Sequence, residues 1–325
     1  MTDTYPEPSP VTRYWDDYWR GTGAAGAYSS GGANHPAIQA FWDDFFSRVK
    51  SEYVTPSMLD VASGNGAVVE RALAAFEDYP AKISCVDISA AAVANIKSRF
   101  DSVHGIVCDA RSVPLESACF DIITSQFGIE YSGEEAISEA VRLLDTGGSL
   151  ALLMHSKSGV IYQECSENLE AINRFRESGF IPGAHAMFKA GFEAVRGADR
   201  APYDEAAKQL TPAVTEAEAI MRQFGADVAD DTISRLYGDV AQIHAKIQYY
   251  DPQEVLSWLE KMDPELEAFA GRMQSMIDAA IDNSRFEAIC SKIAEEGCHI
   301  DQAGPFLAHG HNTHLGWVIV ARKQP

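Results

Sequence analysis

The sequence predicts an α/β fold in which a seven-stranded, mostly parallel sheet carries a large helical insertion, or lid, before its last two strands. Three observations predict it. From residue 57, short apolar runs alternate with alanine-rich helical stretches, which is typical of a parallel sheet. After residue 155 the alternation stops and helical periodicity takes over. Strand character then returns near the last residues, in the sequence LGWVIVAR.

These observations divide the chain into four parts. Residues 1–56 form a lead-in, which is expected to contain two helices on either side of a glycine-rich and serine-rich stretch. Residues 57–155 form the α/β core. Residues 156–296 form the helical lid, and residues 297–325 supply the strands that complete the core sheet.

The strands follow from apolar runs that are separated by helical or turn residues. They are expected at residues 58–62, 83–87, 104–108, 120–125, 149–155, 299–307 and 315–322.

The helices of the core fill the gaps between these runs. They are expected near residues 67–76, 90–100 and 134–144. The turn 145–148, with its paired glycines, is expected to end the third helix and to lead into the fifth strand. In the insertion, apolar residues recur at helical intervals and indicate packing faces. One such face contains Ile233, Leu236, Val240 and Ile243.

The charge of the chain restricts its partners. Lysine and arginine number 26 against 47 aspartates and glutamates, so the formal net charge is −21. The negative electrostatic potential of such a protein repels phosphate backbones and anionic lipid headgroups. We therefore expect a small-molecule substrate, with neither nucleic acid nor membrane as partner. The sequence predicts no oligomeric state.

The cysteines and the first residues favour a cytoplasmic protein. The six cysteines are scattered without a close Cys-x-x-Cys pair, which indicates reduced thiols. The first ten residues, MTDTYPEPSP, contain neither a basic region nor an apolar run, and no later stretch approaches 18 apolar residues. Secretion and membrane spanning are therefore not expected.

A glycine turn follows the first strand in the sequence LDVASGNG. Asp60 ends the strand, and the backbone at Gly64 and Gly66 can approach a ligand closely because no side chain intervenes. The following helix would present free amides at its first turn. Such a turn suits a nucleotide or an amino-acid carboxylate.

Two further acids end neighbouring strands. Asp87 ends the second strand, where a carboxylate can accept both hydroxyls of a ribose. Asp109 follows the third strand, where an acid can meet the exocyclic amine of adenine. Acids at successive strand ends point into one crevice, which indicates an adenosine ligand.

At this point the residues resemble a known family. Residues 59–155 are similar to the class I S-adenosylmethionine-dependent methyltransferases, whose sheet is Rossmann-like. LDVASGNG resembles their first motif, ISCVDIS the second, VCDA the third and FDIITSQFGIEY the fourth, and RLLDTGGSLAL resembles the helix and turn before their fifth strand. The departure is Ala62, which replaces the usual first glycine of the first motif. Alanine is small, so we expect cofactor binding to survive.

The resemblance implies a role for each matching residue. Asp60, Gly64 and Gly66 would hold the methionine moiety, Asp87 the ribose and Asp109 the adenine. Ser125 and Gln126 would lie beside the sulfonium. The expected cofactor-binding set also includes Ala62, Ile88, Ala110 and Tyr28.

Nicotinamide and flavin cofactors are the rival interpretation, because they bind to a related fold. Their fingerprint has a third glycine where this chain has Val69. Asp60 would also place a negative charge beside a pyrophosphate. S-adenosylmethionine has no phosphate, and its ammonium group suits that acid.

The acceptor side offers two candidate catalytic residues. His155 follows the fifth strand, whose end faces the ligand crevice, and histidines titrate near neutral pH. Tyr14 belongs to an aromatic segment that, in similar methyltransferases, folds over the cofactor. The histidines of AHGHNTH, which are His309, His311 and His314, have no acid nearby, and we expect no metal site.

Three hypotheses remain open. The first is methyl transfer to a nitrogen, oxygen or sulfur atom of a small molecule that is amino-acid-like or a natural product. The second is another alkyl transfer, such as cyclisation of the cofactor's own side chain to azetidine-2-carboxylate with release of methylthioadenosine. The third is cofactor binding without catalysis.

Overall fold

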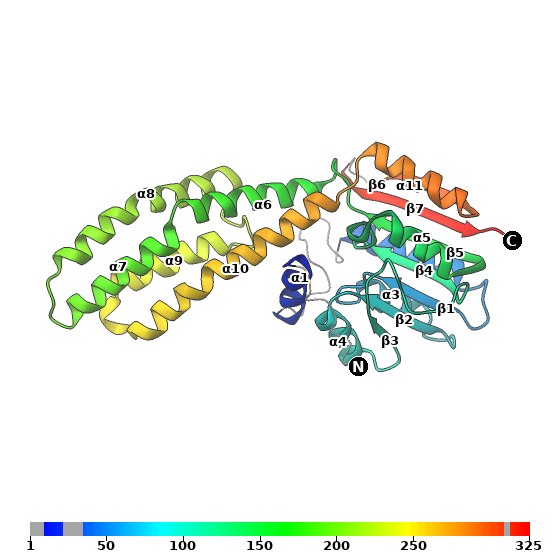
Figure 1. Ribbon diagram of the computed structural model, residues 1–325, viewed down its shortest axis with the longest axis horizontal. Coiled ribbons are helices and arrows are strands. Elements are labelled where there is room, and N and C mark those ends of the chain that lie inside the picture. Colours follow the sequence, from blue (N-terminus) through cyan, green and yellow to red (C-terminus); the bar gives the residue numbers. More distant parts are fainter. Residues whose placement is uncertain (1–9, 22–34, 309–312) are drawn as a thin grey trace, which may run out of the picture. The chain divides into compact units, whose positions relative to one another are not determined.

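The computed structural model describes residues 10–21, 35–308 and 313–325 (Figure 1). The chain folds into two units. Unit 1 is built from Met1–Glu164 and Ser275–Pro325, and unit 2 from Cys165–Gln274. The chain therefore leaves unit 1 after its fifth strand and returns to it before the last two.

A seven-stranded sheet with the order β3-β2-β1-β4-β5-β7-β6 forms the centre of unit 1. Its first five strands are parallel, and β7 is antiparallel to both β5 and β6. This architecture confirms the predicted fold class. The strands are β1 (Ser57–Val61), β2 (Lys82–Asp87), β3 (His104–Val107), β4 (Phe120–Gln126), β5 (Leu144–Met154), β6 (Cys298–Leu307) and β7 (His314–Lys323).

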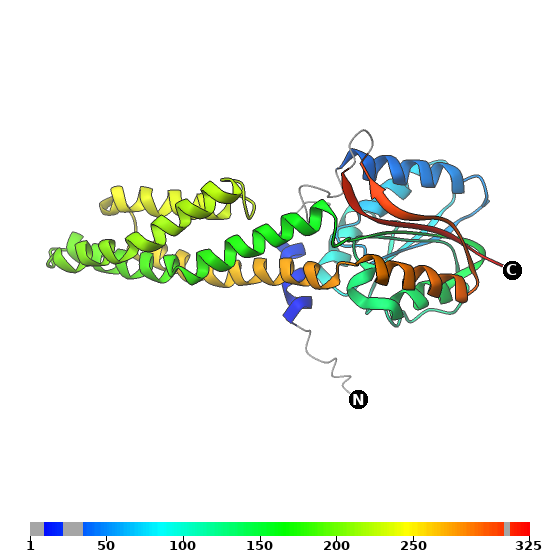
Figure 2. The same ribbon diagram turned by 90° about the horizontal axis from the view of Figure 1, so that it is seen from above.

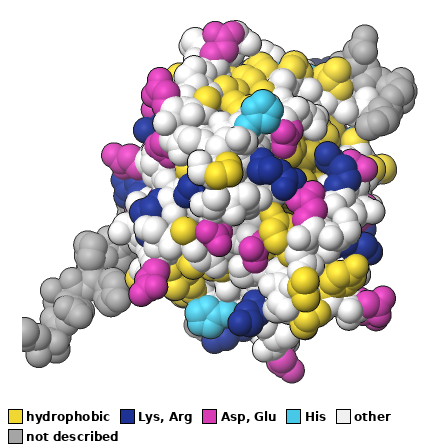
Figure 3. Space-filling model, turned by 90° about the vertical axis from the view of Figure 1, so that its right-hand side faces the viewer, with side chains coloured by type: hydrophobic (Ala, Val, Ile, Leu, Met, Phe, Trp, Pro, Cys, Tyr) yellow, Lys and Arg dark blue, Asp and Glu magenta, His cyan; other side chains and the backbone are white. Residues whose placement is uncertain are grey.

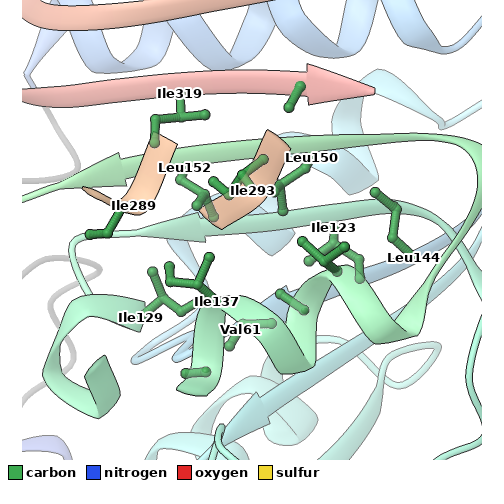
Figure 4. Packing of buried hydrophobic residues seen from close by; sticks show 14 of the residues in the cluster. Val61, Ile123, Ile129, Ile137, Leu144, Leu150, Leu152, Ile289, Ile293 and Ile319 are labelled. Carbon is green, nitrogen blue, oxygen red and sulfur yellow. The ribbon is translucent and has the colours of Figure 1, made fainter. Parts of the chain in front are cut away.

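Helices cover both faces of this sheet (Figure 2). One apolar cluster joins the sheet to α5 and α11, and Figure 4 shows Ile293 of α11 between Leu150 and Leu152 of β5, with Ile137 of α5 near Ile129. A second cluster joins the opposite face to α2, α3 and α4. The helical segments of unit 1 are α1 (Pro10–Gly21), α2 (Pro36–Val49), α3 (Ala67–Ala75), α4 (Ala90–Arg99), η1 (Ile129–Ser132), α5 (Gly133–Leu143) and α11 (Asn283–Glu295).

The start of β5 differs from the prediction. The turn expected at residues 145–148 lies inside β5, which begins at Leu144. Leu144 pairs with Phe120 and Ser149 pairs with Ile122, so four residues of β5 lie opposite a single residue of β4 and three of them are extra. Gly147, at φ +79°, permits this irregularity. Residues 145–148, which are typical of turns, therefore lie within a strand.

Unit 2 is helical, as its periodicity predicted. Ile233, Leu236, Val240 and Ile243 are all buried on one helix, which confirms that this stripe is a packing face. The chain enters unit 2 within the first helix of the insertion and leaves it within the last. These helices are α6 (Val160–Glu177), α7 (Phe180–Val195), α8 (Ala201–Phe224), α9 (Thr232–Ala245), η2 (Ile247–Tyr249) and α10 (Pro252–Ala279).

The segments that flank the insertion are joined to each other inside unit 1. The N–H of Ile281 donates to the carbonyl of His155 at 3.0 Å, and the N–H of Lys157 donates to the carbonyl of Ile281 at 3.0 Å. Trp317 Nε1 of β7 donates to the same Ile281 carbonyl at 2.9 Å. The backbone just after β5 is thus held by Ile281, which lies two residues after the end of α10.

The space-filling view in Figure 3 shows charged side chains of both signs on one face of the molecule. On the face shown in Figure 3, basic side chains are interspersed with acidic ones. Within the described residues, no helix is long and apolar enough to cross a bilayer.

Candidate active site

The turn between β1 and α3 has the backbone conformation that a glycine-rich sequence permits. Ala62, Gly64 and Gly66 have φ values of +53°, +51° and +84°. A Cβ atom on Gly66 would lie 2.9 Å from Ile96 Cγ1 of α4, so glycine also allows the close packing of α3 on α4. The turn is closed by a hydrogen bond of 2.8 Å from the N–H of Gly66 to the carbonyl of Ser63.

Asp60 lies beneath this turn with only 1% of its surface exposed. Thr124 Oγ1 of β4 donates to its Oδ1 at 2.7 Å. Burial raises the pKa of Asp60 to about 7, and the nearby charge of Asp87 adds to the effect, while the hydrogen bonds from Thr124 and Ser63 oppose it. A neighbouring cation stabilises the ionised form of a buried carboxylate, and the ammonium group of S-adenosylmethionine would be such a cation.

Asp87, the last residue of β2, lies beside the same turn. Its Oδ2 accepts the N–H of Gly64 at 2.8 Å and its Oδ1 accepts the N–H of Ser89 at 2.8 Å. Burial raises the pKa of Asp87, although these backbone hydrogen bonds oppose the shift. Each oxygen keeps a lone pair that can accept a ribose hydroxyl. Ile88, which follows, is 48% exposed and could cover a flat ligand.

Asp109 is engaged in an ion pair. Its carboxylate accepts hydrogen bonds from Arg111 Nε at 3.0 Å and from Arg111 Nη2 at 2.6 Å. These bonds lower the pKa of Asp109. The backbone places it near Asp87, because the N–H of Cys108 donates to the carbonyl of Asp87 at 3.1 Å. Ala110 beside it is buried. Contact of Asp109 and Ala110 with adenine stays a prediction.

Ser125 and Gln126 end β4 and have partners within the protein. The hydroxyl of Ser125 donates to the carbonyl of Val61 at 2.7 Å and accepts the N–H of Ile129 at 3.1 Å, so it links β1 to η1. Oε1 of Gln126 accepts the indole N–H of Trp42 at 2.6 Å. Their position beside the sulfonium stays a prediction.

His155 is fully buried directly after β5 and forms a pair with Glu130 of η1. Its Nδ1 lies 2.6 Å from Glu130 Oε1, and its own backbone N–H donates to the same oxygen at 2.8 Å. The ring of Phe127 packs on the imidazole with centroids 4.8 Å apart. A carboxylate on Nδ1 fixes the tautomer in which Nε2 is the basic nitrogen.

The remaining candidates include one residue of α1 and three that fall outside the described residues. Tyr14 is half-buried on α1, and its catalytic role stays a prediction. Tyr28, His309 and His311 fall outside the described residues. His314 Nε2 lies 2.7 Å from the carbonyl of Gly316. In the part of the chain that the structure describes, no three metal-ligating side chains cluster.

Two residues of the site were missed in the sequence. Glu130 is the only acid in the apolar stretch FGIEY, which was a usable signal, because a carboxylate in a buried segment needs a partner. Trp42 gave no such signal, since it belongs to an amphipathic helix with several other aromatic residues.

Comparison with known proteins places the site in a family. Residues 59–152 match the methyltransferase domain family. An uncharacterized methyltransferase of Schizosaccharomyces pombe is 28% identical over 138 residues, which cover 42% of this chain and 52% of that protein. The ubiquinone/menaquinone biosynthesis C-methyltransferase UbiE of Campylobacter jejuni is 31% identical over 117 residues, which cover 34% and 50%. The chain thus spans about half the length of the curated relatives it matches.

Solved structures with similar folds include two methyltransferases. The CurJ carbon methyltransferase superposes with a TM-score of 0.46 at 11% identity, over 90% of this chain and 56% of that one. The geranyl diphosphate C-methyltransferase of Streptomyces coelicolor superposes with a TM-score of 0.33 at 16% identity, over 46% and 66%.

The family match covers the strands and turns that carry Asp60, Asp87 and the glycine turn. The raised pKa of Asp60 and the conformation of the turn fit the ammonium and carboxylate of the cofactor that this family uses. Residues 59–152 therefore form a class I S-adenosylmethionine-dependent methyltransferase domain.

Proposed function

We propose that the chain transfers the methyl group of S-adenosylmethionine to a small-molecule acceptor whose reacting atom carries a proton, and that His155 removes this proton. The observation that carries the proposal is the buried pair of Glu130 and His155. A transfer to an acceptor that is already nucleophilic would need no base.

The sheet supports a place for His155 at the cofactor site. β5 is parallel to β4, and β4 is parallel to β1, so their carboxyl ends lie at one edge of the sheet. Asp60 is near the end of β1, and His155 directly follows β5. Ligands of open α/β sheets bind at this edge.

The chemistry divides between the cofactor and the chain. Bound S-adenosylmethionine supplies a methyl group that its sulfonium charge activates. Glu130 accepts Nδ1–H and stabilises the imidazolium that forms when Nε2 takes the acceptor's proton. Phe127 and the buried surroundings exclude water from the imidazole. The acceptor would then attack the methyl carbon with the electron pair that the proton left behind, while the bond from that carbon to sulfur would break and its electrons would stay on the sulfur of the departing S-adenosylhomocysteine.

Charge and relatives support a small acceptor. The net charge of −21 disfavours nucleic acid. Relatives of this chain are named as methyltransferases of ubiquinone and menaquinone biosynthesis and of malonyl-[acyl-carrier protein]. Those names extend the candidate acceptor atoms from nitrogen, oxygen and sulfur to carbon. The covering role of the helical insertion and the cytoplasmic location stay predictions.

The test is a product search with isotopically labelled cofactor. The protein is incubated with a metabolite pool and methyl-labelled S-adenosylmethionine, and labelled products are identified by mass spectrometry. We expect a labelled product with the wild type and none with His155→Ala. Methylthioadenosine formed from cofactor alone would instead support cyclisation, and tight cofactor binding without any product would support a non-catalytic protein.

A further inference from the structure

The carboxylate of Glu130 is bound at only one of its two oxygens. Oε1 lies within hydrogen-bond distance of both the backbone N–H and Nδ1 of His155, whereas Oε2 is buried and has no hydrogen-bond partner in the part of the chain that the structure describes. Moving such an oxygen into water would lower its free energy, yet Glu130 is only 3% exposed. Its position beside His155 therefore depends on the backbone of η1, which carries it.

That backbone follows a strained turn. Phe127, the first residue after β4, has φ +53°, a left-handed conformation that costs a residue with a side chain about 1–2 kcal/mol. Such a conformation persists only where neighbouring contacts hold it. The N–H of Phe127 donates to the carbonyl of Leu153 in β5 at 2.7 Å, which fixes the start of the turn. The end of the turn, where η1 begins, needs its own connection to the sheet.

Ser125 supplies this connection. Its hydroxyl accepts the N–H of Ile129 at 3.1 Å and donates to the carbonyl of Val61 at 2.7 Å. The first residue of η1 is thus joined to the last residue of β1. Ser125 and Ile129 are fully buried, so water does not compete for these two hydrogen bonds. Glu130 directly follows Ile129, so the hydroxyl acts one residue away from the carboxylate that meets the imidazole.

We propose that Ser125 is a positioning residue for the reaction, because its hydroxyl holds η1 where Glu130 meets His155. The inference rests on the proposed function. It differs from the contact with the sulfonium that the resemblance implies for Ser125, and the two roles make opposite predictions. Without the hydroxyl, the N–H of Ile129 loses its partner, the strained turn relaxes and the carboxylate moves off the imidazole.

The first test needs no acceptor. In protein with isotope-labelled histidines, NMR detects the proton on Nδ1 of His155, which resonates far downfield because a carboxylate accepts it. The resonance is assigned by its absence from His155→Gln. We expect Ser125→Ala to lose it, as Glu130→Gln does. The matched control is Ser149→Ala, which removes another buried hydroxyl, one that is hydrogen-bonded to Tyr53, and which should keep the resonance.

A Ser125→Ala protein that keeps the resonance at its wild-type position would overturn the proposal. If this variant does not fold, Ser125→Cys takes its place, because a thiol is only a weak donor and acceptor in nearly the same volume. The resonance should then move upfield or broaden, and an unchanged resonance in Ser125→Cys would count against the proposal in the same way.

Calorimetric titration with S-adenosylmethionine separates the two roles of Ser125. A residue that acts on Glu130 should leave the Kd of Ser125→Ala within about threefold of the wild type. A residue beside the sulfonium would instead weaken binding by about tenfold or more. That second result, with the resonance of His155 intact, would assign Ser125 to the cofactor.

Kinetics with the acceptor found in the product search show whether Ser125 acts through Glu130. Ser125→Ala should lower kcat by about tenfold or more, but added to Glu130→Gln it should change kcat by less than about twofold. Independent losses in the double variant would contradict the proposal. A wild-type kcat in Glu130→Gln would show that the proposed base is wrong, while the NMR result would still decide whether Ser125 positions the carboxylate.

Discussion

A Cβ atom on Gly128 would lie 2.6 Å from the Cβ of Ala62 and 2.8 Å from the Ala62 carbonyl oxygen. Ala62 itself has φ +53°, a left-handed conformation that costs a residue with a side chain about 1–2 kcal/mol. Similar methyltransferases have glycine at this position. The Cβ atom of Ala62, which a glycine would lack, therefore fits only because Gly128 has no side chain.

The two positions should be energetically coupled. Gly128→Ala should lower the free energy of unfolding by about 1–3 kcal/mol through overpacking. Ala62→Gly should change it by less than about 1 kcal/mol, since relief of strain is offset by greater freedom of the unfolded chain. In Ala62→Gly/Gly128→Ala the loss should shrink, though not vanish, because the carbonyl contact remains. Urea denaturation of all four proteins measures the coupling, and additive effects would contradict it.

Cofactor affinity should rise with pH around neutrality. The pKa of Asp60 is about 7, so below this pH its carboxyl is protonated and attracts an ammonium group less. Affinity should increase by up to about tenfold per pH unit below that pKa and level off above it. Calorimetric titrations at several pH values give the profile. The same titrations of Asp60→Asn should show weaker binding without this rise, and a parallel rise in the variant would assign the dependence to another group.

The same shift predicts the pH dependence of folding without cofactor. Because the folded protein keeps a proton on Asp60 that the unfolded chain loses above about pH 4, this residue's contribution to stability declines as pH rises from about 4 to about 7. Thermal unfolding of the wild type and of Asp60→Asn measures this effect. The melting temperature of the wild type should fall relative to that of Asp60→Asn as pH rises from about 4 to about 7, so the variant gains relative stability. A constant difference between the two would refute the assignment.

Glu130→Gln tests the positioning of the base. An amide cannot stabilise the imidazolium and can favour the wrong tautomer, so kcat should fall by about 10²-fold to 10⁴-fold. Cofactor affinity should hold, because Glu130 contacts His155 and not the glycine turn. The matched control is Glu134→Gln, an exposed acid of α5. A kcat within threefold of the wild type, with an unchanged pH profile, would show that the pair is structural.

Substitutions of Asp109 and Arg111 separate a ligand contact from an ion pair. If Asp109 meets adenine, Asp109→Ala should weaken S-adenosylmethionine binding by about tenfold, the effect of one lost hydrogen bond to a charged group. Arg111→Ala should weaken it less, because the half-exposed ion pair contributes at most about 1 kcal/mol. Equal losses in both variants would mean that Asp109 acts only by holding Arg111.

The sheet could be predicted because its signals are local. Short apolar runs mark β1, β2 and β4, and an acid at the end of a strand, such as Asp87, follows from the same pattern. The start of β5 could not, because residues 145–148 are typical of turns, and only the pairing of Leu144 and Ser149 with β4 on either side keeps them within the strand. At these residues, pairing between strands overrides the local preference for a turn.

The partners of the site residues were harder to predict than the residues themselves. His155 and Glu130 are 25 residues apart, and they meet through the pairing of β4 with β5 and the turn into η1. Val61 and Ser125 are 64 residues apart, and they meet because β1 pairs with β4. Arg111 was not foreseen as a partner of Asp109 either, since a side chain two residues along a loop has many possible directions.

The hydrogen bonds between Ile281 and the backbone at His155 and Lys157 bring the two borders of the insertion together. The ends of the inserted helices are therefore fixed by neighbouring backbone atoms rather than by the helices themselves. Evolution could lengthen, shorten or replace such an insertion without disturbing the cofactor half, since ends that are already close add little loop-closure entropy. On the proposed function, the acceptor would then diversify with the insertion while the proposed base His155, whose carbonyl belongs to this junction, is kept.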